Sequence, residues 1–200
     1  GSVQHLILNT TALVTVSRLV HKNAIDDVIR ALKFLPDSVR FRIYGTGSEE
    51  KKLKNLANEL GIGSRVEFMG HIDHSKLPNA LSECDIFIRP SRSEGMGNSF
   101  IEAMAAELPV IATQEGGIAD FLFDAKRNPD KGTTGWAVDK NSPEQIANAV
   151  KDILAHPEQV ARVTATAKKM AIEKYDWNLI ARDMRSVFDR VYSTARRNAA

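Results

Sequence analysis

Two carboxylates and a pair of glycines within one short stretch are the residues best suited to bind a ligand. The stretch reads Ser-Arg-Ser-Glu-Gly-Met-Gly-Asn-Ser-Phe-Ile-Glu, with Glu94 before Gly95 and Gly97, and Glu102 after them. Glycines let a backbone turn sharply and approach a ligand without interference from a Cβ atom. The helix formers that follow predict a helix N-terminus, which carries partial positive charge. The pattern predicts a phosphate site, with Asn98 as the helix N-cap.

The spacing of the two glutamates predicts separate contacts. Glu94 falls in the predicted loop and Glu102 about one turn into the predicted helix, so the two cannot be neighbours on one helical face. We expect each carboxylate to bind a different part of one elongated ligand. The alternative is that Glu94 only orders the loop and Glu102 is a solvated helix residue.

Two cations and a second glycine pair accompany this stretch. Arg18 and Lys22 follow the first predicted strand, where an arginine can bind a diphosphate bidentately and a lysine as a point charge. A solvated surface pair is the alternative. The Gly45-Thr46-Gly47 run lacks the third glycine of a dinucleotide fingerprint, and no acidic residue ends the following strand, so the NAD interpretation is weak.

Other chemistries have little support in the sequence. His71 and His74 form an H-x-x-H without a third ligand nearby, so a zinc site is not favoured. The absence of a D-x-D run argues against a metal-chelated diphosphate. There is neither a serine nucleophile elbow nor a P-loop lysine. Trp136 and Trp177 are interpreted as core or interface residues.

Composition limits the class of protein. The chain has 200 residues, 43% of them hydrophobic, which suits one globular domain or one lobe of a larger enzyme. A net charge of +2 does not favour nucleic acid. Cys84 is the only cysteine, so the chain can form no internal disulfide, which indicates a reducing, cytoplasmic compartment. We find no apolar run of membrane-spanning length and no signal peptide, and Gly1-Ser2 resembles a cloning scar.

Strand-like and helix-like segments alternate along the chain. The predicted strands are residues 12–16, 39–44, 66–69, 84–88, 109–112 and 136–138. The predicted helices are residues 24–34, a segment ending at Gly61, and residues 75–81, 100–106, 118–123, 143–154, 157–174 and 178–191. This order predicts an α/β fold: a doubly wound, Rossmann-like parallel sheet of about six strands with helices on both faces. Glycine loops at Gly45, Gly95 and Gly116 would meet at the carboxyl ends of the strands, where such folds bind ligands.

The segment from Pro90 to Ala105 resembles a motif of the family 4 retaining glycosyltransferases, in which seven residues separate two glutamates. Glu94 and Glu102 have that spacing. Two further segments are similar to the family pattern: Val16-Ser17-Arg18-Leu19 with Lys22 after it, and Gly116-Gly117-Ile118. The similarity covers nearly the whole chain, and the combination is specific although each piece alone is not.

The resemblance implies the GT-B fold, in which two Rossmann-like lobes face a cleft, and it covers only the C-terminal lobe. That lobe binds a nucleotide-sugar donor, here a UDP- or GDP-sugar, without a metal or other cofactor. The diphosphate would contact the two cations, the glycine loop would offer amides, and the two glutamates would bind sugar and ribose hydroxyls. The implied catalytic residues are Glu94, Arg18 and Lys22. The implied donor-binding residues are Gly45, Gly95, Met96, Gly97, Asn98, Ser99 and Glu102.

The same resemblance divides the chain and implies partners. Residues 1–11 would be a scar and linker, residues 12–176 the nucleotide-sugar-binding domain, and residues 177–200 a helix and basic tail packing toward an N-terminal acceptor lobe. That lobe is absent from this sequence, so this chain alone would not transfer sugar. The parent enzyme would be involved in polysaccharide or glycoconjugate biosynthesis, with peripheral membrane association as a further expectation. A GT-B nucleotide-sugar epimerase and a non-catalytic nucleotide-binding domain remain alternatives.

Three residues depart from the family pattern. Asn23 stands where a glycine usually follows the lysine, so that loop is expected to differ in shape. Arg89 replaces an apolar residue at the end of a predicted strand, for which the sequence offers no account. Asp120 stands where glutamate is common, and it receives no role. The polar loop at residues 125–134 is longer than usual.

Overall fold

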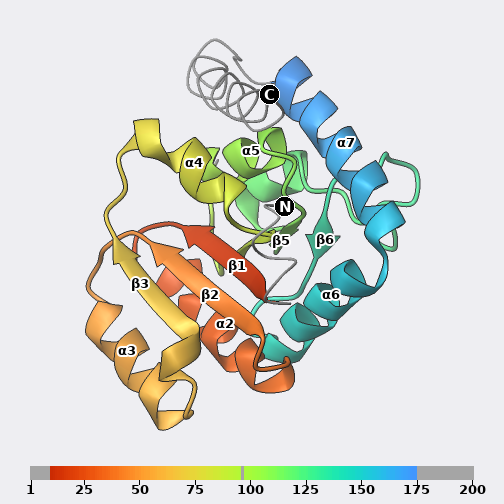
Figure 1. The fold of residues 1–200 in the computed structure, drawn as a ribbon. Coiled ribbons are helices and arrows are strands. Elements are labelled where there is room, and N and C mark those ends of the chain that lie inside the picture. The colour runs from red at the N-terminus through yellow and green to blue at the C-terminus, as the bar shows by residue number, and fades with distance from the viewer. Residues whose placement is uncertain (1–9, 96, 175–200) are drawn as a thin grey trace, which may run out of the picture.

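Short runs of β-branched and aromatic residues form a parallel sheet in the computed structural model, which describes residues 10–95 and 97–174. The sheet has six strands in the order β3-β2-β1-β4-β5-β6, and every neighbouring pair is parallel (Figure 1). The strands are β1 Thr11–Val16, β2 Val39–Tyr44, β3 Val66–Gly70, β4 Ile86–Arg89, β5 Val110–Ala112 and β6 Trp136–Ala137. The predicted doubly wound α/β fold is therefore confirmed.

Helices cover both faces of this sheet (Figure 1). The α-helices are α2 Ile25–Ala31, α3 Glu50–Glu59, α4 Leu77–Ser82, α5 Asn98–Ala105, α6 Pro143–Ala155 and α7 Pro157–Lys174. Short 3₁₀ turns supplement them: η1 His21–Asn23, η2 Leu32–Phe34, η3 Gly63–Arg65, η4 His74–Lys76 and η5 Gly116–Asp120.

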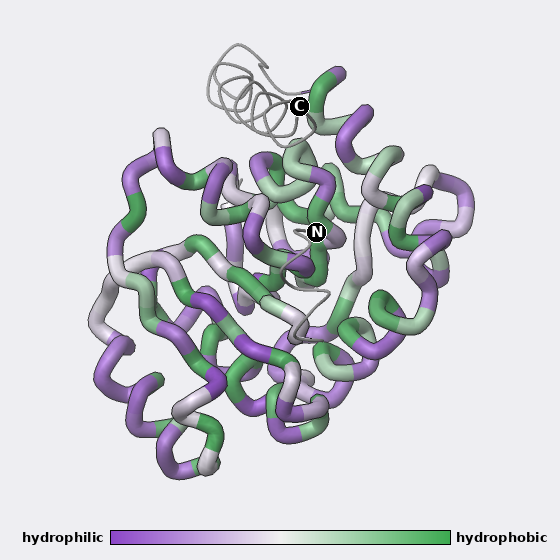
Figure 2. The backbone as a smooth tube through the Cα atoms, viewed as in Figure 1, coloured by the Kyte–Doolittle hydropathy of each residue, from purple (hydrophilic) through white to green (hydrophobic). Residues whose placement is uncertain are grey.

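Alternation along each strand divides the core into two layers. In β4, Ile86 and Ile88 pack with α2, α3 and α6, whereas Phe87 packs with α4, α5 and α7. Successive strand residues point to opposite faces, so a strand that is buried on both sides is apolar at every position except where a polar group has a partner. Helices need only one apolar stripe. Figure 2 accordingly shows α3 as largely hydrophilic, while Leu53 and Ala57 are buried.

The differences from the predicted elements are local. The segment predicted as one helix at 24–34 is α2 followed directly by η2, and it begins at Ile25 because Ala24 adopts a left-handed conformation (φ 54°). The predicted 118–123 helix is the 3₁₀ turn η5. The fourth strand begins at Ile86, since the Asp85 carboxylate accepts the Ala12 amide at 2.8 Å. The predicted 178–191 helix lies outside the described residues.

Candidate functional site

The glycine loop joins β4 to α5 at the carboxyl edge of the sheet. Gly97, not the predicted Asn98, is the N-cap of α5, and Asn98 is the first helical residue. Gly97 has an extended conformation that suits an N-cap, and no side chain caps this helix. A Cβ atom on Gly97 would lie 2.5 Å from Arg89 Nη2 and 2.7 Å from the Phe100 ring. Only glycine fits here, and the helix N-terminus is left without a side-chain acceptor.

The two predicted cations lie on the loop after β1, at the same edge of the sheet. Arg18 and Lys22 are exposed. Asn23 is 4% exposed, and its side-chain amide donates to the Arg18 carbonyl at 2.7 Å, closing the loop between the two cations. This hydrogen bond gives Asn23, the first departure from the family pattern, a structural role.

Gly45 allows a close approach of two backbones. Its φ is 138°, and a Cβ atom there would overlap the Ser17 carbonyl oxygen. The neighbouring backbone therefore belongs to the loop of Arg18, and the Leu19 amide also donates to the Thr46 carbonyl at 2.9 Å. These contacts fix the loop that carries Arg18 and Lys22, here called the cation loop, to the end of β2.

Arg92, which sequence analysis did not single out, joins the glycine loop to the cation loop. Its backbone amide donates to the Lys22 carbonyl at 2.7 Å. Its guanidinium bonds Asp26 bidentately at 2.9 and 3.0 Å, Asp27 at 2.8 Å and Asn141 Oδ1 at 2.6 Å. Burial alone would raise the pKa of Asp26, but the hydrogen bonds and charge of Arg92 lower it. For Asp27, burial and the neighbouring Asp26 prevail and raise the pKa.

Glu94 is a buried member of an ion pair. Its side chain is 9% exposed and pairs with Arg89, whose side chain is 7% exposed. Its Oε1 accepts the Gly95 amide at 3.0 Å, and Ser91 Oγ lies 3.4 Å from its Oε2. The Gly95 amide, predicted to bind phosphate, is thus hydrogen-bonded within the loop. Arg89, unexplained in the sequence, has this carboxylate as its partner.

Glu102 has different surroundings from Glu94. It lies on α5 with its side chain 15% exposed, and its Oε1 is 3.3 Å from His74 Nδ1. His71 lies 3.7 Å from Asp73, so the two histidines of the H-x-x-H have separate partners. Among residues 10–95 and 97–174, no group of three or more His, Cys, Asp or Glu residues could hold a metal ion.

The glycine loop at Gly116 packs against the glycine loop that contains Glu94 and Gly95. Gly116 has φ 56°, and a Cβ atom there would overlap the Glu94 carbonyl oxygen. Thr113 Oγ1 donates to the Ser91 carbonyl at 2.6 Å, which holds the end of β5 to the glycine loop. Asp120 is exposed. The structure therefore brings the three glycine loops, both cations and Glu94 together, whereas Met96 lies outside the described residues.

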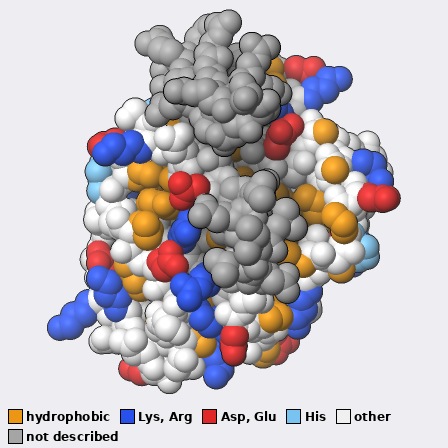
Figure 3. Space-filling view, in the orientation of Figure 1, with side chains coloured by type: hydrophobic (Ala, Val, Ile, Leu, Met, Phe, Trp, Pro, Cys, Tyr) orange, Lys and Arg blue, Asp and Glu red, His pale blue; other side chains and the backbone are white. Residues whose placement is uncertain are grey.

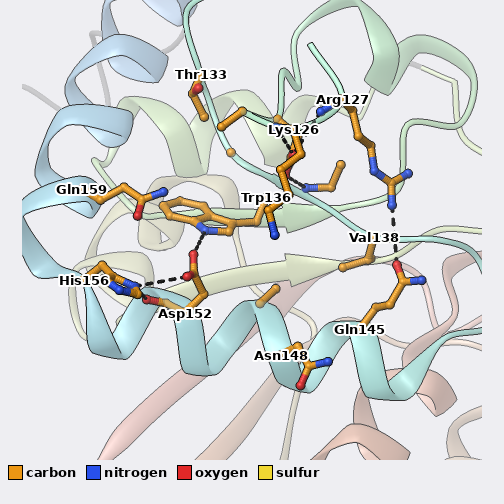
Figure 4. A pocket seen from close by; sticks show the side chains of 15 residues that line it. Lys126, Arg127, Thr133, Trp136, Val138, Gln145, Asn148, Asp152, His156 and Gln159 are labelled. Carbon is orange, nitrogen blue, oxygen red and sulfur yellow. Dashed lines mark hydrogen bonds and ion pairs between the residues drawn. The ribbon is translucent and has the colours of Figure 1, made fainter. Parts of the chain in front are cut away.

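A separate cavity of about 740 Å³ lies beside β6 and contains none of the predicted site residues. Figure 4 shows Trp136 pointing toward Asp152 of α6, and the indole nitrogen donates to this carboxylate at 2.8 Å. Trp136 is 7% exposed, in agreement with its predicted core position. Trp177 lies outside the described residues.

The surface charges are dispersed on the face shown in Figure 3, where acidic and basic side chains alternate instead of forming one patch. This distribution agrees with the small net charge of +2. Within the described ranges, no helix has the length and apolar character needed to cross a membrane.

A doubly wound sheet with glycine loops gathered at one carboxyl edge defines a nucleotide-binding class of α/β protein. The chain belongs to the glycosyl transferases group 1 family, whose model matches residues 4–170. It is 32% identical over 176 residues to a GDP-mannose-dependent phosphatidylinositol monomannoside mannosyltransferase of Mycolicibacterium smegmatis, with 82% of this chain and 44% of the relative covered. It is 27% identical to a glycogen synthase of Mycobacterium tuberculosis, covering 92% and 43% respectively. The chain thus spans about half the length of these curated relatives.

Solved structures agree with this fold. HepE from Anabaena, solved with UDP-glucose, superposes with a TM-score of 0.77 at 22% identity, covering 95% of this chain and 51% of HepE. The C-terminal domain of LpcC, a glycosyl transferase group 1 protein of Francisella tularensis, superposes with a TM-score of 0.70 at 22% identity, covering 82% and 86%. The expected glycosyl transferases group 1 family and the Rossmann-like sheet architecture are therefore confirmed.

Proposed function

We propose that this chain is the donor-binding half of a retaining glycosyltransferase and binds a UDP- or GDP-sugar. The observation that carries the proposal is the convergence of two exposed cations, three glycine loops and an uncapped helix N-terminus at one sheet edge. A helix N-terminus with nearby Arg and Lys side chains favours a diphosphate. The mannosyltransferase and HepE comparisons add GDP-mannose and UDP-glucose as examples of the donor class.

Each group would act on a different part of the donor. Arg18 and Lys22 would neutralise charge that develops on the leaving diphosphate, as cations do in phosphate transfer sites. Glu94 would accept a sugar hydroxyl and Glu102 the ribose hydroxyls. The acceptor would come from an N-terminal lobe of the parent enzyme, which is not part of these residues.

We expect a nucleoside diphosphate to stabilise the chain in the presence of EDTA. Ligand at about 100 times its dissociation constant stabilises by roughly 2.7 kcal/mol, and a domain of this size gains about 2–4 °C per kcal/mol. Thermal melting with UDP, GDP and ADP should therefore show a rise of roughly 5–10 °C for one base, independent of divalent metal.

Two controls accompany this measurement. Arg18→Met should remove most of the melting shift, whereas Lys51→Met on α3, which also removes one exposed cation, should leave it intact. The absence of any shift at millimolar concentrations of all three nucleotides would contradict the proposed function.

The two glutamates should give different binding signatures. Glu102→Gln should weaken a nucleoside diphosphate and its sugar nucleotide equally, by roughly tenfold or more, because charge-assisted hydrogen bonds contribute about 1.5–3 kcal/mol. Glu94→Gln should leave the bare diphosphate nearly unaffected but remove most of the affinity that the sugar adds. Calorimetric titration of both variants with both ligands measures this. Equal small effects in all four titrations would refute the separate roles.

A further inference from the structure

Arg89 is a buried cation that contacts each segment around the glycine loop. Its Nη1 donates to the Val16 carbonyl at the end of β1 at 3.0 Å and to Ser99 Oγ in α5 at 2.9 Å. Its Nη2 pairs with Glu94, and its guanidinium lies 4.4 Å from the centre of the Phe100 ring. One side chain therefore ties the first strand, the loop and the start of α5 together.

The ion pair and two further hydrogen bonds fix the orientation of the Glu94 carboxylate. A carboxylate offers about four acceptor positions. Three are used in the described residues: Arg89 and Ser91 Oγ contact Oε2, and the Gly95 amide contacts Oε1. One position on Oε1 remains, on a side chain that is 9% exposed.

Without Arg89, this carboxylate would be a buried, uncompensated negative charge. It would lie in the loop that precedes the uncapped N-terminus of α5, where the diphosphate is expected. Like charges at such distances repel more strongly in a buried site than in water. Burial lowers the pKa of the Arg89 guanidinium and the Glu94 charge opposes this, so the pair is mutually dependent.

We propose that Arg89 is a positioning residue for donor binding that acts through Glu94. It holds one oxygen of the carboxylate ready for one sugar hydroxyl, and it cancels the carboxylate charge beside the diphosphate. The proposal rests on the proposed function, since it concerns the same site. It assigns to Arg89 a role that the family resemblance does not supply.

A double-variant cycle on this 200-residue chain tests the proposal. The variants are Arg89→Met, Glu94→Gln and their combination, titrated in EDTA with UDP, GDP and the matching sugar nucleotides. Arg89→Met should weaken the bare diphosphate by roughly tenfold, because the Glu94 charge is then exposed to it. The combined variant should restore most of that affinity, since no charge is left to repel the ligand. All three variants should lose the affinity that the sugar adds.

Two further variants separate positioning from folding. Arg65 is an equally buried arginine at the opposite edge of the sheet, where it donates to the Val39 carbonyl at 3.0 Å. Arg65→Met should lower the melting temperature without changing binding. Arg89→Lys keeps the charge but lacks the planar fork, so it should bind the bare diphosphate normally and lose much of the sugar contribution.

The outcomes are distinct. A combined variant that binds the bare diphosphate as weakly as Arg89→Met overturns this proposal while leaving the proposed function intact. Should Arg89→Met fail to fold, full retention of the sugar contribution in Arg89→Lys overturns it equally. A parent chain that binds none of the nucleotides overturns the proposed function and this inference with it.

Discussion

Gly116→Ala should destabilise the fold by about 2–5 kcal/mol, because two costs add at this position. A left-handed conformation costs an L-residue roughly 1–2 kcal/mol, and overpacking against a fixed neighbour typically adds about 1–3 kcal/mol. The Cβ atom would overlap the Glu94 carbonyl oxygen, a backbone atom that cannot move away as a flexible side chain could. Thermal melting should show a fall of about 10 °C.

Gly95→Ala is the matched control for this prediction. It lies in the adjoining loop, its φ is not positive, and a Cβ atom there would meet nothing within 4 Å. Its effect on stability should stay within about 0.5 kcal/mol. Similar melting temperatures for the two variants would show that the two loops can separate at little cost.

Arg92→Met should destabilise the chain by about 2–3 kcal/mol at neutral pH. The substitution leaves Asp26 and Asp27 adjacent without their cation, and the Asp27 side chain is only 6% exposed. The cost is below that of a fully buried pair because the Asp26 side chain is 26% exposed. Urea denaturation gives the free-energy difference directly.

This destabilisation should depend on pH in a defined direction. Arg92 lowers the pKa of Asp26, so its contribution is present above the unfolded pKa of about 3.9 and is lost as pH falls through the lower folded pKa. In the variant, burial and mutual repulsion raise both carboxyl pKa values, which favours the protonated forms at low pH. The difference between parent and variant should therefore shrink from pH 7 toward pH 4.

Arg40→Met provides the comparison, since its ion pair with Glu67 is largely exposed and should contribute about 0.5 kcal/mol. A pH-independent loss in Arg92→Met would mean that Arg92 acts through packing instead of through its charge.

Elements with a strong local pattern could be predicted from the sequence. The bounds of β2 and the start of α7 at Pro157 were predicted without error, because alternation along a buried strand and helical spacing after a proline are both local signals. The change from α-helix to 3₁₀ turn at Leu32 could not be predicted, since helical spacing continues through residues 24–34.

The interaction partners of the site residues were harder to predict from the sequence than the site residues themselves. Arg92 pairs with Asp26, 66 positions earlier in the chain, and no periodicity reports a contact at that separation. Arg89 did carry a signal, as a charged residue that ends an otherwise apolar strand five positions before Glu94. Such a residue in a buried strand requires a partner, and that partner is Glu94, the next carboxylate along the chain.

The strand order has a consequence for how the site assembles. Strand pairing within the first half of the sheet (β1, β2 and β3) and within the second half (β4, β5 and β6) joins segments that are close in the sequence. The pairing of β1 with β4 instead joins segments about 70 residues apart. Pairing β1 with β4 has the larger entropic cost of loop closure, so we expect this pairing to form late in folding. The cation loop belongs to the first half and the glycine loop to the second. On the proposed function, a nucleotide would therefore bind only after the two halves have paired, and its binding would report a late step of folding.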